Sequence, residues 1–184
     1  MAALRFPALL IELQCLLYST QPRNRSGNQG AGNMELYHFC PVPLQTGSVI
    51  LPGNWGRIIA SYSMPENCNA LVVRELLLEN ARLKISPDKP SRLEAVFSCV
   101  GRESMELFKK ERPHDICYRV ELCDEGLPAF TGSWAHVGAP NGSSMPMQVW
   151  HEIAEHYWSM DWHAKAPQTL ELLSASPLRI LGRA

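Results

Sequence analysis

Apolar and polar positions follow two different periods along the chain, and both predict regular structure from about residue 34 onward. Six segments have the alternation, or the β-branched and aromatic content, that is typical of strands. These strands are predicted at 35–39, 93–98, 116–122, 130–138, 169–175 and 177–182, with the weakest pattern at 130–138.

Three further segments repeat apolar residues at helical spacing, at 70–83, 102–111 and 147–158. In the first helix, Asn67 or Asn69 is the expected cap and Pro87 lies beyond the end. Its expected core positions are Val73, Leu76, Leu77 and Ala81, and its expected solvent positions are Arg74, Glu75, Glu79 and Arg82. Prolines and glycines between 41 and 57 predict a loop. Strands outnumber helices and several neighbours suit antiparallel pairing, so the predicted fold class is α+β.

The first 33 residues lack such a pattern. Residues 1–20 are apolar, but Glu12 and Gln14 interrupt the run, which argues against both a secretory signal and a membrane span. Residues 21–33 are polar and glycine-rich, as in a flexible linker. We therefore expect one domain over 34–184, Met34 as the natural start, and a location in the cytoplasm or in a target cell to which the protein is delivered.

Composition narrows the class of protein. Of the 184 residues, 46% are hydrophobic and 19% charged, which is typical of a globular domain rather than a disordered chain. The net charge of −1 and the lack of a basic cluster argue against binding nucleic acid through phosphates, but leave nucleic acid open as a substrate. The six cysteines show no metal or redox spacing, so we expect free thiols, buried or half-buried, in a reducing compartment.

The segment HEIAEH at 151–156 superficially resembles a zinc-protease helix. A zinc pair needs two histidines four residues apart on one helical face. His151 and His156 are five apart, which turns them about 140° from each other. We therefore expect a helix with a polar face and no metal.

The informative motifs are short and follow a fixed order. They are LYHFC with Tyr37-His38, GNWGR ending at Arg57, PSRLEAVFSC with Arg92 and Phe97-Ser98, CYRVEL, and TLELLSASPLRILG with Glu171. In this order the chain resembles the ADP-ribosyltransferases with a His–aromatic–Glu triad, and in layout the small bacterial rifampin-modifying transferases. The resemblance covers nearly all of 34–184. It implies a split, mostly antiparallel β-core with flanking helices around an NAD⁺ cleft.

The resemblance also implies roles for the first two motifs. Tyr37-His38 would bind the adenosine ribose of NAD⁺ through His38, and the backbone of Phe39 would bind the nicotinamide amide. The family usually has glycine at the position of Phe39, so this residue departs from the pattern. Phe97, followed by Ser98, would stack on nicotinamide, for which a phenyl ring suffices.

Glu171 corresponds to the catalytic carboxylate of the family. Cleavage of the nicotinamide–ribose bond builds positive charge on the ribose, which a fixed carboxylate stabilises. Strand alternation turns Glu171 away from Leu170 and Leu172. Arg57 and Arg92 would hold the pyrophosphate, since a guanidinium presents five donors in a plane. Thr169 stands where transferases that modify arginine often have a Glu or Gln, which argues against arginine as the acceptor.

The predicted function is therefore transfer of ADP-ribose from NAD⁺ to an acceptor that is a protein, a nucleic acid or a small molecule, by a bacterial toxin, effector or modifying enzyme. Two alternatives stay open: a binding module of the same fold without activity, and an NAD⁺ glycohydrolase. From the residues alone, His38 and Phe97 also suit a core role, Arg57 and Arg92 surface ion pairs, and Glu171 a solvated strand edge.

Overall fold

The computed structural model describes residues 34–62, 70–138 and 146–184. Seven strands form one sheet in the order β2-β7-β4-β1-β3-β6-β5, and every pairing is antiparallel. The strands are β1 (Leu36–Cys40), β2 (Val49–Ile50), β3 (Val96–Val100), β4 (Ile116–Leu122), β5 (Ala129–Ser133), β6 (Leu170–Ser174) and β7 (Leu178–Arg183). With its helices, the sheet confirms the α+β class.

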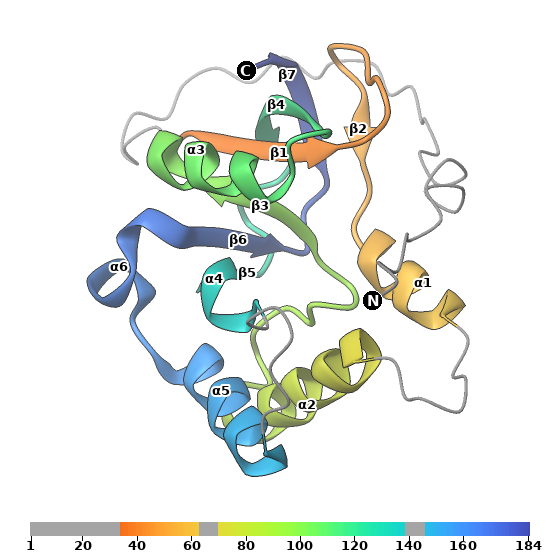
Figure 1. The fold of residues 1–184 in the computed structure, drawn as a ribbon. Coiled ribbons are helices and arrows are strands. Elements are labelled where there is room, and N and C mark those ends of the chain that lie inside the picture. Colours follow the sequence, from red (N-terminus) through yellow and green to blue (C-terminus); the bar gives the residue numbers. More distant parts are fainter. Residues whose placement is uncertain (1–33, 63–69, 139–145) are drawn as a thin grey trace, which may run out of the picture.

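Six α-helices accompany the sheet in the described ranges (Figure 1). They are α1 (Asn54–Ser61), α2 (Ala70–Ile85), α3 (Gly101–Glu111), α4 (Trp134–Val137), α5 (Met147–Ser159) and α6 (Trp162–Lys165), and a 3₁₀ turn (Pro167–Thr169) precedes β6. α2 and α5 pack against each other below β5 and β6 in the view of Figure 1, whereas α3 packs on β1 and β3. None of these helices is long and apolar enough to cross a membrane.

The predicted helices at 70–83, 102–111 and 147–158 are confirmed within two residues at each end. The strand prediction for 130–138 was wrong in its second half, because the chain turns after Ser133 into the short helix α4. The strand predicted at 93–98 begins only at Val96, after a turn, and continues to Val100. The predicted loop at 41–57 contains β2 and the first turn of α1, whose helical period is hidden by glycines. The proposed caps Asn67 and Asn69 lie outside the described residues, as does the whole segment 1–33.

Strand register decides which side chains share a face of the sheet. Tyr37 pairs with Cys99, and Cys99 pairs with Glu171, so these three side chains lie in one row on one face. α3 covers this face near β1, where Met105 packs with Tyr37, Cys99 and Cys117. Ser98 pairs with Leu172 on the opposite face, to which alternation also turns His38. The ladder between β1 and β3 ends at Tyr37, whereas β1 stays paired with β4 up to Cys40.

Cys99, Cys117 and Cys123 confirm the expectation of free thiols. Cys40, Cys99 and Cys117 are buried, and Cys123 is half-buried. Burial raises the pKa of Cys117 to about 11, and burial with the nearby Glu171 carboxylate raises the pKa of Cys99 further. These thiols are therefore protonated and unreactive at neutral pH. Cys15 and Cys68 lie outside the described residues.

Candidate functional site

Arg92 is the centre of a buried ionic cluster that joins β6 to α2 and α5. It lies in the turn before β3, and its side chain reaches two carboxylates. Its Nε donates to Glu75 Oε2 at 3.1 Å and its Nη1 donates to Glu171 Oε1 at 2.8 Å. Arg92 and Glu171 are each 6% exposed, and Glu75 is 1% exposed. Charges this deep in a protein persist only when they are paired.

Tyr157 completes the cluster from α5. Its hydroxyl accepts a hydrogen bond from Arg92 Nη1 at 2.7 Å and donates one to Glu171 Oε1 at 2.9 Å. Burial and the Glu171 charge raise the pKa of Tyr157 well above its ordinary value, although Arg92 opposes this, so the hydroxyl keeps its proton. The Arg92 guanidinium also lies 4.9 Å from the ring centre of Phe97 and 5.1 Å from that of Tyr157, within the range of cation–π attraction.

The charges in the cluster balance. Arg74 donates to Glu75 Oε1 at 2.7 Å, so two guanidinium groups face two carboxylates. Burial alone would raise the pKa of Glu75, but Arg92 and Arg74 outweigh it and hold this pKa below its ordinary value. Burial alone would lower the pKa of Arg92, yet Tyr157, Glu171 and Glu75 hold it well above its ordinary value. Glu75 and Arg92 are therefore both charged at neutral pH.

The two oxygens of Glu171 have different surroundings. Oε1 takes part in both hydrogen bonds of the carboxylate. Oε2 has no hydrogen-bond partner within 34–62, 70–138 and 146–184, and the Glu171 side chain as a whole is 8% exposed. Glu171 therefore combines an anchored oxygen with one that is not engaged by any described residue.

His38 lies where β1 and β3 part. Its Nδ1 is 2.7 Å from the Phe97 carbonyl oxygen, and because a carbonyl only accepts, Nδ1 must carry the proton. Burial lowers the pKa of His38, an effect that the Phe97 hydrogen bond and Asp115 only partly offset. The ring is therefore neutral at pH 7, and Nε2 offers a lone pair with no partner in the described part of the chain.

Two buried polar side-chain atoms in the described residues have no hydrogen-bond partner, Ser98 Oγ and Trp55 Nε1. Ser98 follows Phe97 on β3, and Trp55 belongs to α1, which packs on the turn before β3. A Cβ on Gly56 would lie 2.1 Å from the Leu93 carbonyl oxygen, so only glycine permits this approach. An unpartnered buried donor costs about 1–3 kcal/mol, which makes both atoms candidates for contact with a bound molecule.

The remaining predicted site residues have separate surroundings. Tyr37 is buried, and its hydroxyl donates to Glu35. Phe39 meets Phe108 edge to face at 5.2 Å between ring centres, on the side covered by α3. Arg57 is exposed and hydrogen-bonds the Asn54 side chain within α1.

The structure thus brings Phe97, Arg92 and Glu171 together on one face of the sheet. His38 contacts only the backbone carbonyl of Phe97, and alternation turns its side chain to the opposite face. Sequence reasoning missed Tyr157, which was not among the predicted site residues. It also placed Glu75 and Arg82 on the solvent side of α2, which was wrong for both. Both are buried because each has a charged partner at hydrogen-bonding distance, Glu75 with Arg92 and Arg82 with Glu79. The helical spacing of apolar residues predicts only which face of a helix is polar. It does not show that a charged residue on that face is buried by an ion-pair partner.

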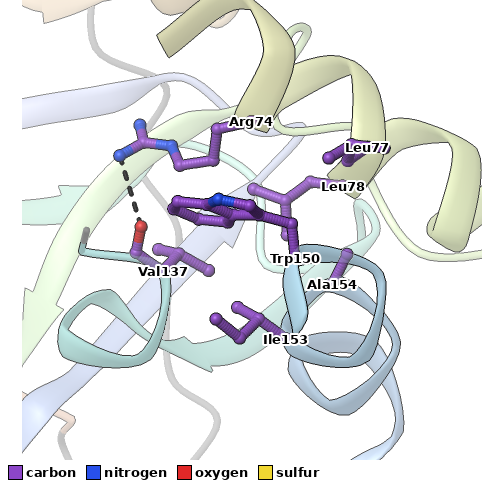
Figure 2. A pocket seen from close by; sticks show the side chains of 7 residues that line it. All are labelled: Arg74, Leu77, Leu78, Val137, Trp150, Ile153 and Ala154. Carbon is purple, nitrogen blue, oxygen red and sulfur yellow. Dashed lines mark hydrogen bonds between the residues drawn. The ribbon is translucent and has the colours of Figure 1, made fainter. Parts of the chain in front are cut away.

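A small apolar hollow lies elsewhere, between α2, α4 and α5 (Figure 2). Figure 2 shows the Trp150 indole amid the lining side chains, and the Arg74 guanidinium bonded to the Val137 carbonyl oxygen at 3.3 Å. The lining includes none of the residues expected to bind NAD⁺. His151 and His156 are exposed on α5, and no group of three or more metal-ligating side chains occurs in the described ranges.

Comparisons with known proteins add no family assignment. No protein-family model matches the chain, and a search of the curated proteins finds no match. The function must therefore be argued from the site.

Proposed function

We propose that the domain transfers ADP-ribose from NAD⁺ to an acceptor and releases nicotinamide. The observation that carries this proposal is the setting of Glu171, a nearly buried carboxylate whose Oε1 is fixed by two donors while Oε2 has no hydrogen-bond partner in the described residues. A preorganised carboxylate of this kind stabilises positive charge that develops on a ribose.

In the proposed reaction the bond between C1′ of the nicotinamide ribose and the pyridinium nitrogen breaks. Its electron pair leaves with nicotinamide, which becomes neutral, and the positive charge moves to the ribose ring. Glu171 Oε2 accepts a hydrogen bond from a ribose hydroxyl and stabilises this charge. A nucleophilic atom of the acceptor then bonds to C1′ and loses its proton to solvent.

The other site residues would bind the dinucleotide. His38 Nε2 is an acceptor for a ribose hydroxyl, since Nδ1 is held by the Phe97 carbonyl. Phe97 is half-buried and lies on the same face of the sheet as Glu171, as suits ring stacking, whereas Ser98 Oγ is buried on the opposite face and would not reach the same part of the dinucleotide. Arg57 is exposed and suits a phosphate, whereas Arg92 has most of its donors engaged. Tyr37 would help to hold β1, and therefore its neighbour His38, in place. The backbone of Phe39 would bind the nicotinamide amide.

One observation favours a second candidate, an NAD⁺-binding module without activity. Glu171 is only 6% exposed, and Arg92 already compensates its charge, which reduces its effect on a ribose cation. Under this hypothesis the Arg92–Glu171 pair is purely structural.

Incubation with NAD⁺ that carries separate labels on nicotinamide and on the adenylate half distinguishes the candidates. We expect free nicotinamide together with a labelled acceptor from a lysate, or free ADP-ribose where water is the acceptor. Glu171→Gln keeps the size of the side chain and removes its charge, and should lower nicotinamide release by about a hundredfold or more. Binding of NAD⁺ without release by the wild type would establish the inactive module instead, and equal release by Glu171→Gln would remove Glu171 from the mechanism.

A further inference from the structure

We infer that Tyr157 and Arg92 are positioning residues, which together hold Glu171 Oε1 so that Oε2 faces the reacting ribose. The inference rests on the proposed function and gives a role to two residues that the reaction itself does not use. Neither residue touches the reacting atoms in this scheme, and both act through Glu171.

Three hydrogen bonds close a triangle around Glu171 Oε1. Arg92 Nη1 donates to Oε1 at 2.8 Å, Tyr157 Oη donates to Oε1 at 2.9 Å, and Arg92 Nη1 donates to Tyr157 Oη at 2.7 Å. A single contact would let the carboxylate rotate about its Cγ–Cδ bond. Two donors at one oxygen, themselves linked, fix that rotation and therefore the direction of Oε2.

The triangle is rigid because each member is held from elsewhere. Arg92 is bound through Nε to Glu75 on α2 and lies near the rings of Phe97 and Tyr157. Tyr157 is 0% exposed, and its ring meets Phe130 at 5.5 Å between centres. A small displacement of a catalytic group is costly, since about 1 Å of misplacement can cost about a hundredfold in rate.

The contact between Arg92 and Glu171 is not bidentate. Arginine–carboxylate pairs frequently use both oxygens, as Arg82 and Glu79 do in this chain. Here Arg92 uses one nitrogen for Glu171 and another for Glu75, and Tyr157 shares the oxygen that Arg92 already holds. The second oxygen of Glu171 is left without a partner in the described residues.

Tyr157→Phe tests the inference, because it removes one hydroxyl and keeps the ring and its packing. The matched control is Ser176→Ala, which also removes a fully buried hydroxyl with two hydrogen bonds, but in the turn between β6 and β7. Nicotinamide release by the full chain is measured against NAD⁺ concentration, and the melting temperature is measured in parallel. We expect Tyr157→Phe to lower kcat by about tenfold to a hundredfold with KM for NAD⁺ nearly unchanged. Ser176→Ala should lower the melting temperature by a similar amount and leave kcat unchanged.

Arg92→Lys supplies a second variant, since it keeps the positive charge but loses the fork that reaches two carboxylates. It too should lower kcat more than it raises KM. If wild type and both variants turn over equally while Glu171→Gln is inactive, the positioning role is wrong and the proposed reaction stands. A rise in KM for NAD⁺ at constant kcat in Arg92→Lys would instead make Arg92 a substrate ligand and overturn its positioning role. If wild type releases no nicotinamide, the proposed reaction fails and the positioning role fails with it.

Discussion

Gly132 leaves open the space that the hydroxyl group of Tyr157 occupies. A Cβ built on Gly132 would lie 2.5 Å from Tyr157 Oη and 2.7 Å from two ring carbons. Gly132 is also the β5 residue that pairs directly with Glu171 on β6. The absence of one side chain therefore lets a tyrosine from α5 approach the sheet beside the proposed catalytic carboxylate.

Gly132→Ala should displace Tyr157 from Glu171. We expect it to destabilise the domain by about 1–3 kcal/mol, as overpacking of a dense core does. Nicotinamide release should also fall, because the Tyr157 hydroxyl no longer reaches Oε1. Gly126→Ala is the control, since its new Cβ would meet only Oδ1 of the exposed Asp124 side chain, at 3.2 Å. Urea denaturation of the two variants measures the difference, and equal midpoints would contradict the steric argument.

The sequence predicts local elements of this fold but not the contacts between distant residues, such as that of Gly132 with Tyr157. Alternation and helical spacing depend on local polarity, so they predicted α2, α3, α5 and β4 closely. The order of strands in the sheet depends on contacts between distant residues and could not be predicted. The pattern turned Glu171 away from Leu170 and Leu172, as its pairing with Cys99 confirms, but gave no hint of Arg92 or Tyr157. Those partners are 79 and 14 residues away along the chain.

Arg92→Met should destabilise the domain strongly. The variant leaves Glu75 and Glu171 buried with one guanidinium fewer, and breaking a buried pair in this way costs about 3–5 kcal/mol. Arg179→Met is the matched control, because its ion pair with Glu121 is exposed and contributes about 0–1 kcal/mol. Guanidinium denaturation at neutral pH compares the two variants. A loss no larger than that of the control would mean that the buried cluster does not stabilise the fold.

Stability should fall on the acid side in two stages. The pKa of His38 is lowered in the folded state, so its contribution is present above pH 6.5 and is lost as the pH falls through the lowered pKa. The pKa of Glu75 is also lowered, so its contribution is present above about pH 4.5 and disappears at lower pH. Urea midpoints should therefore decrease from pH 7 to pH 5 and decrease further towards pH 3.

The variant His38→Gln tests the first of these stages. Because burial also lowers the pKa of His136, this variant should reduce the first decrease in the urea midpoint without abolishing it. A midpoint that rises on acidification would contradict these signs.

Arg57→Ala should weaken NAD⁺ binding without affecting the fold. Arg57 is exposed, and its hydrogen bond to Asn54 stays within the same helix, so little stability depends on it. If its guanidinium contacts the pyrophosphate, we expect the Kd for NAD⁺ to rise by about tenfold, which corresponds to about 1.4 kcal/mol. Arg102→Ala is the control, because that side chain is 78% exposed on α3 and its ion pair with Glu106 is 3.9 Å long. Calorimetric titration with NAD⁺ would show equal affinities for both variants if Arg57 is only a surface residue.

NAD⁺ itself should stabilise the domain, and His38 should decide by how much. A ligand at a hundredfold excess over its Kd adds about 2.7 kcal/mol to the free energy of unfolding. Nicotinamide alone should add less, because it fills only part of the proposed site. His38→Ala removes the free Nε2 acceptor and should reduce the shift in melting temperature caused by NAD⁺. Glu171→Gln should leave most of that shift intact, because its charge is needed in the transition state more than in the bound substrate. His38 would then contribute mainly to NAD⁺ binding, and Glu171 mainly to turnover. The absence of any shift with millimolar NAD⁺ in the folded wild type would refute the NAD⁺ site altogether.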